Sequence, residues 1–533
     1  MNLLTTADWL VIAAYFVATY AVALWHSATN RQNPTEFFLA GRNAGWFIVG
    51  ASIFATNIGS EHLVGLAGSG AAGAFPAAQF ELIAAFALVL LGWLFVPFYL
   101  RSGVFTMPEF LERRYSSGVR FYLAAISIVG YVLTKISVTI AAGGIVFEAL
   151  MGIDFWTGAV IVVVATGVYT VIGGMRAVLV SDMFQMFVMI GGSIVVTVVG
   201  LNAVGGWSEL RAAAPPEFFD LWRATSDPDF PWTGILFGAP ILAVWYWCTD
   251  QYIVQRTLAA KSIGEARRAT LFAALLKQLP LFIFVVPGVI AYVLAQRGQL
   301  SLADADSALP ALIGSLLPAG LRGIVVAGLL AALMSSLSSV FNSCATLVTM
   351  DVYKRLAPHH SERRLVVVGQ AATVLMVVFG LAWIPLMDMI SGQLYVYLQS
   401  VQAYISPPIA AVFLIGVLWP RANARVAFAA LLTGLVLGAG RLVLEVNEAP
   451  LTGWLEALVA MNFLHFAILL FVICSAVLVA VSLSTQPPDP TRVGPLTVQH
   501  GRTAGAPDPS RTADIALSVV LIGLVAVSWA YFS

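Results

Sequence analysis

Residues 55–70 read ATNIGSEHLVGLAGSG, which places four glycines and a cluster of polar side chains inside an apolar run. The whole run, about 46 to 70, is long enough to cross the roughly 30 Å of hydrocarbon in a bilayer. A second apolar run is interrupted in the same way by WYWCTDQ at residues 245–251. Two interruptions of this kind indicate helices that unwind near the middle of a membrane.

The composition is that of an integral membrane protein. Of the 533 residues, 60% are hydrophobic and only 10% are charged, whereas a soluble chain needs roughly a quarter charged residues. We expect the first apolar run to be retained, because it lacks the basic segment and cleavage site of a signal peptide. Apolar runs of about 20 residues predict about fourteen spans. They are 7–26, 46–70, 77–100, 119–150, 155–174, 180–203, 235–258, 271–296, 320–352, 363–386, 391–418, 424–443, 457–482 and 514–531.

The distribution of basic residues predicts the topology. Lysine and arginine in short loops favour the cytoplasmic side of a membrane. With the N-terminus outside, most of the 27 basic residues fall in cytoplasmic loops. If one span had been missed or added in error, the basic residues would be divided between the loops on both sides of the membrane. We therefore expect a multi-pass plasma-membrane protein with both termini extracytoplasmic.

The two interrupted spans are five spans apart, and this spacing predicts the domain organisation. Transporters built from two inverted repeats of five helices bind solute and ions where corresponding helices unwind. We therefore expect an all-α polytopic membrane protein with such a core and extra helices at both ends. The expected divisions are 1–45 (first helix and cytoplasmic loop), 46–203 (first repeat), 204–234 (extracellular loop), 235–418 (second repeat) and 419–533 (three helices with a Pro-rich cytoplasmic loop at 484–513).

The stretch LMSSLSSVFNS at residues 333–343 places its hydroxyl groups on one helical face. The small and polar positions fall within an arc of roughly 160°. Serines in membrane helices often bond to the preceding turn and permit close packing, and this interpretation stays open for each single serine. Together, opposite an unwound helix, they favour a dehydrated Na⁺, which needs five or six oxygen ligands. These positions are Ala332, Ser335, Ser336, Ser338, Ser339, Asn342 and Ser343.

Five segments together resemble the solute:sodium symporter family, and are most similar to its sodium/glucose cotransporter branch. They are ASIFATNIGSEHLVGLAGSGAAG (51–73), GGMRAVLVSDMFQ (173–185), WYWCTDQYIVQRTLAAK (245–261), LMSSLSSVFNSCATLVTMDVY (333–353) and QLYVYLQSVQAYISPPIAAVF (393–413). The similarity covers nearly the whole chain in order. It implies an inverted-repeat core of the leucine-transporter type, Na⁺ as coupling ion, no other cofactor and no nucleic-acid partner.

The resemblance implies one sodium site and suggests a second. The common site combines carbonyls of the first broken helix with a carbonyl and two hydroxyls of the serine-rich helix. Its matching positions are Ala55, Ile58, Ala332, Ser335 and Ser336. A second site, present in some members, matches Asp182, Ser338 and Ser339. Asp182 also lies near the predicted start of a span, where the helix dipole favours a carboxylate, so a capping role is an equal alternative.

For a sugar, the resemblance implies a pocket with hydrogen-bonding groups and an aromatic face. The matching substrate positions are Asn57, His62, Glu81, Tyr246, Lys277 and Gln399. The matching gate positions are Leu66, Phe80 and Tyr395 toward the outside and Tyr246 toward the inside.

Simpler interpretations stay open for several of these positions. Lys277 could snorkel to a helix end, and His62 or an aromatic gate could be ordinary packing. Glu81 and Lys277 are nevertheless functional candidates, because ionisable groups inside spans are costly unless they face a partner or a wet cavity. Lys135 also lies in a span, and we assign it no role. Ala84, Ala243 and Gln402 depart from the pattern of sugar-binding relatives and leave the solute open.

The expected function is sodium-coupled import of a glucose- or galactose-like hexose by alternating access. The alternative is a non-hexose solute such as myo-inositol, an amino acid or a vitamin. An enzyme is disfavoured, because no nucleophile–base pair, metal-ligand cluster or phosphate loop is recognisable. A transporter-like sensor would need a sizeable output domain, which the sequence does not indicate. Proton coupling stays open, although neutral hydroxyls suit a metal cation better. The sequence does not give the number of coupled Na⁺ ions or the oligomeric state.

Overall fold

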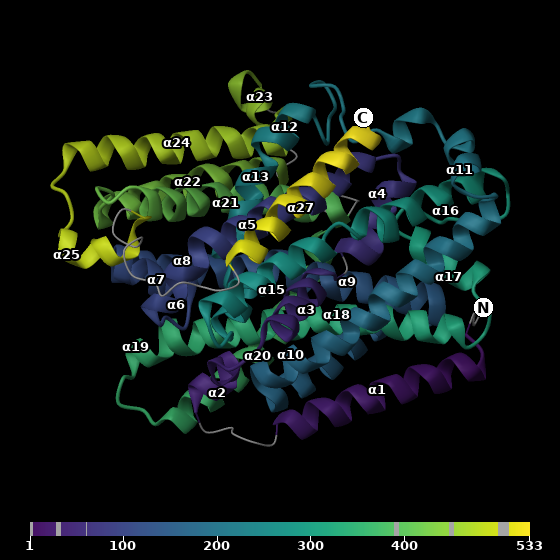
Figure 1. Ribbon diagram of the computed structural model, residues 1–533, viewed down its shortest axis with the longest axis horizontal. Coiled ribbons are helices and arrows are strands. Elements are labelled where there is room, and N and C mark those ends of the chain that lie inside the picture. The colour runs from purple at the N-terminus through teal and green to yellow at the C-terminus, as the bar shows by residue number, and fades with distance from the viewer. Residues whose placement is uncertain (1–3, 28–32, 60, 388–393, 447–451, 499–510) are drawn as a thin grey trace.

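The computed structural model describes residues 4–27, 33–59, 61–387, 394–446, 452–498 and 511–533. Within these ranges the chain is almost entirely helical and contains no strand. Figure 1 shows the long helices running beside one another along the longest axis of the molecule. Eleven helices in the described ranges are long and apolar enough to cross a membrane, and one bent pair would make twelve.

Within the described ranges the predicted spans fall on helices or on broken helices; residue 60 of the second span and residues 391–393 of the eleventh lie outside these ranges. In the first half the elements are α1 (Thr6–Ser27), α2 (Pro34–Leu39), η1 (Ala40–Arg42), α3 (Trp46–Asn57), η2 (Glu61–Leu66), α4 (Ala67–Ala71), η3 (Phe75–Ala78), α5 (Gln79–Leu90), η4 (Leu91–Phe95), α6 (Val96–Ser102), α7 (Met107–Arg114), α8 (Ser117–Tyr131), η5 (Val132–Ile136), α9 (Ser137–Val146), η6 (Phe147–Met151) and α10 (Phe155–Val204). The η elements are short 3-10 or π segments, several of which continue an α-helix.

The second half begins with the connection after α10 and continues through the second broken helix. Its elements are α11 (Trp207–Ala213), η7 (Pro216–Phe219), α12 (Trp232–Phe237), α13 (Ala239–Ala243), η8 (Val244–Thr249), α14 (Gln251–Leu258), α15 (Ile263–Leu276), η9 (Leu281–Val285), α16 (Val286–Gln296), α17 (Ala308–Leu316), α18 (Leu321–Thr346), η10 (Leu347–Tyr353), α19 (Lys354–Leu356), α20 (Glu362–Met387), α21 (Leu394–Leu418), α22 (Ala424–Val446), α23 (Trp454–Ala460), α24 (Phe463–Ser484), α25 (Pro490–Val493), η11 (Gly494–Leu496) and α27 (Arg511–Tyr531).

The predicted number of about fourteen spans is approximate. Beyond the eleven long helices and the bent pair, the two remaining predictions fall on shorter apolar stretches, Thr6–Val22 and Phe155–Val168. The boundaries predicted for the two repeats stay a prediction.

The serine-rich helix α18 forms the centre of the bundle. It packs against α1, α3, α10 and α20. In its apolar stretch 94% of the residues are buried, against 22% in the peripheral α27. The small side chains on α18 explain this position, because Gly, Ala and Ser allow neighbouring helices to approach closely.

The helix α10 consists of two helices joined at Gly174. This glycine has φ 62° and ψ −171°, and a Cβ there would lie 2.9 Å from the carbonyl oxygen of Phe37. Both the conformation and the space therefore require glycine. The second helix begins at this break instead of at residue 180, so Asp182 lies in its interior. The capping alternative for Asp182 is therefore wrong, because the helix dipole acts on the first turn.

Both interruptions predicted from the sequence are confirmed as helix breaks. Helix α3 ends at Asn57, Ile58 is extended (φ −73°, ψ 97°), and the helix that follows is bent by 61° relative to α3. In the second broken helix, η8 ends at Thr249 and Asp250 is extended (φ −76°, ψ 128°) before α14 begins. The Asp250 carboxylate accepts a hydrogen bond from the backbone N–H of Tyr252 at 3.2 Å and so caps α14.

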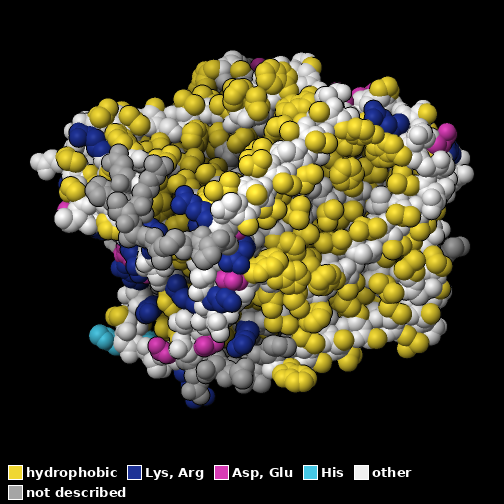
Figure 2. All heavy atoms as spheres, viewed as in Figure 1, with side chains coloured by type: hydrophobic (Ala, Val, Ile, Leu, Met, Phe, Trp, Pro, Cys, Tyr) yellow, Lys and Arg dark blue, Asp and Glu magenta, His cyan; other side chains and the backbone are white. Residues whose placement is uncertain are grey.

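The surface is that of a bundle embedded in lipid. Figure 2 shows a broad hydrophobic face, with the dark blue basic side chains gathered mainly toward the end of the molecule where α2, α6 and α7 lie in Figure 1. This asymmetry is what the positive-inside rule leads us to expect for the cytoplasmic end.

Candidate substrate and ion sites

A cavity lies where the two broken helices meet α5, α13 and α21. The open space inside it is about 40 Å³, which holds a few water molecules and is smaller than a pocket that encloses a small-molecule ligand. Five of the six predicted substrate residues line it: Asn57, His62, Glu81, Tyr246 and Gln399. The other lining residues are Glu61, Phe80, Ala239, Leu242, Ala243, Trp247, Tyr395, Leu398 and Gln402.

The sixth predicted residue, Lys277, is the centre of a polar network behind the cavity wall. Its ammonium group donates to Asn57 Oδ1 and to Glu81 Oε2 and lies 3.2 Å from His62 Nε2. His62 Nε2 is 3.0 Å from Glu81 Oε2, and the Asn57 amide donates to the Tyr246 hydroxyl at 2.8 Å. Residues from four separate segments are therefore held in one arrangement.

The structure decides one of the simpler interpretations left open by the sequence and leaves another open. Lys277 follows the last residue of α15 and its side chain is fully buried, so it does not snorkel to a helix end. His62 is buried but lines the cavity, and its Nδ1 atom has no hydrogen-bond partner among the described residues. Its Nε2 atom lies 3.0 Å from Glu81 Oε2, so both interpretations of His62, a packed core residue and a substrate contact, stay open.

The predicted gate residues differ in their relation to the cavity. Phe80 and Tyr395 both line it, and their rings meet edge to face with centroids 6.0 Å apart. The Tyr395 hydroxyl donates to the carbonyl of Ala77 at 3.3 Å. Leu66 is buried but does not line the cavity. Phe80 and Tyr395 therefore lie at the cavity and Leu66 does not, and the gate assignments stay predictions.

The predicted common sodium site lies where the end of α3 contacts α18. The Ser336 hydroxyl donates to the Thr56 carbonyl at 2.9 Å, and a Cβ on Gly59 would come within 2.4 Å of Ser336 Oγ. Glycine therefore permits the close approach. The Ser335 hydroxyl donates to Asp182 Oδ1 at 2.5 Å. The two segments that carry Ala55, Ile58, Ala332, Ser335 and Ser336 thus face each other, and the ligand assignment stays a prediction.

Asp182, from the predicted second sodium site, is surrounded by donors. It accepts from Ser52 at 2.5 Å and from Thr56 at 3.1 Å, and Arg256 lies 3.9 Å away. The Arg256 guanidinium also donates to Ser52 at 3.0 Å and to Ser339. A guanidinium thus lies among the oxygens expected to bind a second ion. It would repel that ion, so the occupancy of this site stays a prediction.

Ser338, the remaining member of that predicted site, has a different partner. Its hydroxyl donates to the carbonyl of Ser335 at 2.9 Å within the same helix. This is the local bond that the packing interpretation of a membrane serine describes.

The sequence reasoning missed two features of the site. Glu61 lines the cavity although we did not single it out. Lys135, to which we assigned no role, pairs with Asp250 at 2.5 Å, and its ammonium lies 3.8 Å from the ring centroid of Tyr252 and 4.1 Å from that of Tyr246. The available signal was the presence of three ionisable residues inside spans, but their partners lie far away in the sequence.

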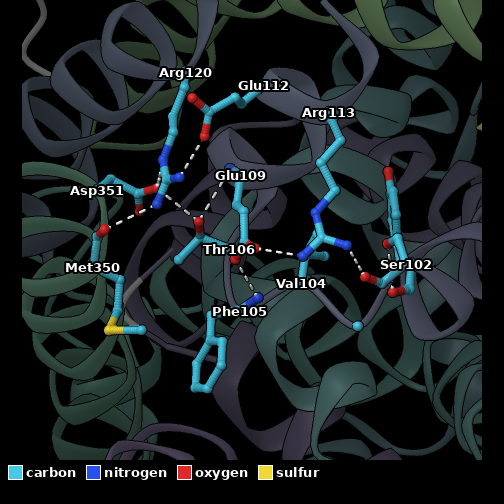
Figure 3. Close-up of polar contacts among 12 residues, drawn as sticks. Ser102, Val104, Phe105, Thr106, Glu109, Glu112, Arg113, Arg120, Met350 and Asp351 are labelled. Atoms are coloured by element: carbon cyan, nitrogen blue, oxygen red, sulfur yellow. Dashed lines mark hydrogen bonds and ion pairs between the residues drawn. The ribbon is translucent and has the colours of Figure 1, made fainter. Parts of the chain in front are cut away.

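A second polar network lies toward the arginine-rich end of the bundle (Figure 3). Arg120 of α8 pairs with Asp351 of η10 and with Glu112 of α7, both at 2.6 Å. The same guanidinium donates to the carbonyl of Met350 at 2.9 Å, and the Thr106 hydroxyl donates to Asp351 at 2.8 Å. These contacts join the end of the serine-rich helix to α7 and α8, and so hold the bundle together on that side.

The model of the sodium:solute symporter family matches residues 37–434. The chain belongs to this family. A Danio rerio sodium/glucose cotransporter 4 is 38% identical, with 91% of this chain and 80% of the relative covered. A Bos taurus sodium/mannose cotransporter is 40% identical (93% and 89%), and a Homo sapiens sodium/myo-inositol cotransporter is 38% identical (91% and 74%).

Two solved structures show the same fold. A Na⁺-coupled sialic acid symporter in a substrate-bound, outward-open state aligns with a TM-score of 0.78 at 22% identity, covering 91% of this chain and 99% of that one. A nucleobase-cation-symport-1 transporter in a closed conformation aligns with a TM-score of 0.52 at 14% identity, covering 87% and 99%. The leucine-transporter-like core expected from the sequence is thereby confirmed, and Na⁺ is the coupling ion of the family to which this multi-pass membrane protein belongs.

Proposed function

We propose that this protein is a sodium-coupled symporter that imports a hexose across the plasma membrane. The observation that carries the proposal is the cavity at the two helix breaks, with its hydrogen-bonding residues and the Tyr246 ring. A pyranose presents several hydroxyl groups and an apolar ring face, and such a wall suits both. Relatives named for glucose and mannose cotransport support the same class of solute.

Alternating access would follow from the position of the proposed ion site. Na⁺ bound between α3 and α18 would bridge the first repeat to the second and stabilise the state that is open to the outside. Asn57 is the last residue of α3, the helix that also carries Ala55. An ion held by Ala55 would therefore also fix the position of Asn57 for the solute. A ligand shifts such an equilibrium only through its different affinity for the two states. Release of Na⁺ inside would therefore weaken solute binding and favour release.

The energy available is sufficient for concentrative uptake. One charge that moves through 100 mV releases about 2.3 kcal/mol, and a tenfold Na⁺ gradient adds about 1.4 kcal/mol. Their sum supports accumulation of about a few hundred-fold per coupled ion. A second ion would square this factor, so the occupancy of the Asp182 site decides the limit.

The proposed orientation places the arginine-rich end in the cytoplasm and both termini outside. In this orientation the network of Arg120 and Asp351 lies toward the cytoplasmic end of the bundle. The proposed repeats, 46–203 and 235–418, then each contribute one broken helix to the cavity.

The direct test is uptake of labelled sugars and polyols into proteoliposomes, with Na⁺ replaced by choline or Li⁺. We expect accumulation above equilibrium for at least one hexose, only when Na⁺ is present outside. Equal accumulation without Na⁺ would contradict the proposal.

The second candidate is a cyclic polyol. Relatives named as sodium/myo-inositol cotransporters are as similar in sequence as the glucose cotransporters. Gln402 and Ala243 line the cavity where this sequence departs from sugar-binding relatives. Inclusion of myo-inositol in the uptake panel separates the two candidates.

A further inference from the structure

Glu61 is a buried carboxylate in the wall of the cavity. It is the first residue of η2, directly after the break in the first broken helix, and only 7% of it is exposed. No hydrogen bond or ion pair joins its carboxylate to another residue in the described part of the chain. A carboxylate removed from water without a partner is costly. A hydrogen-bond donor from outside the chain, such as a solute in the cavity, would remove that cost.

The other charged groups around the cavity are already paired. Glu81 is held by Lys277 and His62, and Lys135 is held by Asp250. Glu61 is thus the carboxylate of the cavity wall without a paired cation in the described part of the chain, and in its ionised form, with His62 neutral, it gives the wall an excess of negative charge. A solute with its own carboxylate would be repelled, whereas hydroxyl groups would find a strong acceptor.

We propose that Glu61 is a substrate-binding residue that selects uncharged polyhydroxyl solutes. Its two oxygens accept hydrogen bonds from two adjacent hydroxyl groups, and the same charge excludes solutes that carry a carboxylate. The inference rests on the proposed symport of a sugar or polyol and narrows its substrate class. Amino acids and acidic vitamins are excluded as solutes, whereas hexoses and cyclic polyols are accepted.

Glu61 also lies next to the proposed ion site. A Cβ on Gly59 would be 4.0 Å from Glu61 Oε2 and 2.4 Å from Ser336 Oγ. The carboxylate is therefore at the side of the cavity that adjoins the serine-rich helix. A cation bound near Ser336 would stabilise the negative charge of Glu61 by Coulomb attraction. The ion thereby prepares the acceptor for the solute.

The test is uptake of a series of deoxy analogues of a transported sugar or polyol by wild type, Glu61→Ala and Glu61→Gln. For wild type we expect KM to rise at least tenfold when either of two adjacent hydroxyls is removed. For Glu61→Ala the same two analogues should be transported no worse than the parent solute. A merely structural role would not change this discrimination. The matched control is Glu209→Gln, which changes a carboxylate on α11, outside the cavity.

The second arm uses a uronic acid that corresponds to a transported hexose. Wild type should exclude it, and Glu61→Gln, which keeps the size and loses the charge, should admit it at least tenfold better. The proposal is overturned if Glu61→Ala discriminates among the deoxy analogues as wild type does, or if wild type transports the uronic acid as well as the hexose. If Glu61→Ala does not fold, Glu61→Gln and the wild-type uronic acid measurement still decide. Failure of wild type to take up any sugar or polyol with Na⁺ would instead contradict the proposed function.

Discussion

Replacement of Lys135 by methionine removes a buried ammonium group and keeps most of the side-chain volume. Lys135 and Asp250 are 2.5 Å apart, with side chains 3% and 1% exposed. Breaking such a pair costs about 3–5 kcal/mol, because the remaining charge is left buried. Asp250 keeps its hydrogen bonds from Tyr131 and from the Tyr252 backbone, so we expect the lower end, about 3 kcal/mol.

The free energy of unfolding in detergent can be followed through the buried cysteines. Cys248, Cys344 and Cys474 are free and buried, so a fluorescent thiol reagent reports their exposure. The control is Lys261→Met, because the Lys261 side chain is 53% exposed and its ammonium group lies 3.9 Å from Glu265. Such a surface pair contributes at most about 1 kcal/mol.

The double variant Lys135→Met/Asp250→Asn tests the physical reason. Because it leaves no uncompensated charge, it should be more stable than Lys135→Met alone. The reasoning would be refuted if Lys135→Met were as stable as Lys261→Met. It would also be refuted if the loss of stability in the double variant equalled the sum of the losses in Lys135→Met and Asp250→Asn.

Three further predictions concern the ions and the arginine-rich end. Ser336→Ala should raise the Na⁺ concentration for half-maximal uptake about tenfold, since one ligand contributes about 1–1.5 kcal/mol; an unchanged requirement would exclude this hydroxyl as a ligand. Asp182→Asn should lower the Hill coefficient for Na⁺ only if a second ion is coupled. Arg120→Met should speed the labelling of Cys344 severalfold from the cytoplasmic side, because Asp351 and Glu112 lose their shared partner; unchanged labelling would show that this network does not close the protein.

Much of the fold follows from local features of the sequence. Apolar runs fixed the helices within a few residues, and Gly and polar residues inside two runs marked the breaks at Ile58 and Asp250. The boundary before Asp182 was misplaced, because hydropathy does not register the kink at Gly174. The resemblance to a family supplied the substrate positions, and five of the six line one cavity.

By itself, then, the sequence determined which segments enter the membrane, where two of them unwind and which helical face carries the hydroxyls. Only the tertiary structure decided the pairing of the buried charges. Glu81 pairs with Lys277, 196 positions away, and Lys135 pairs with Asp250, 115 positions away. Glu61 pairs with neither of these lysines. The physical reason is the distance along the chain over which each effect acts. Hydropathy and helical periodicity act within one helix, whereas the partner of a buried charge depends on which helices become neighbours when the bundle packs.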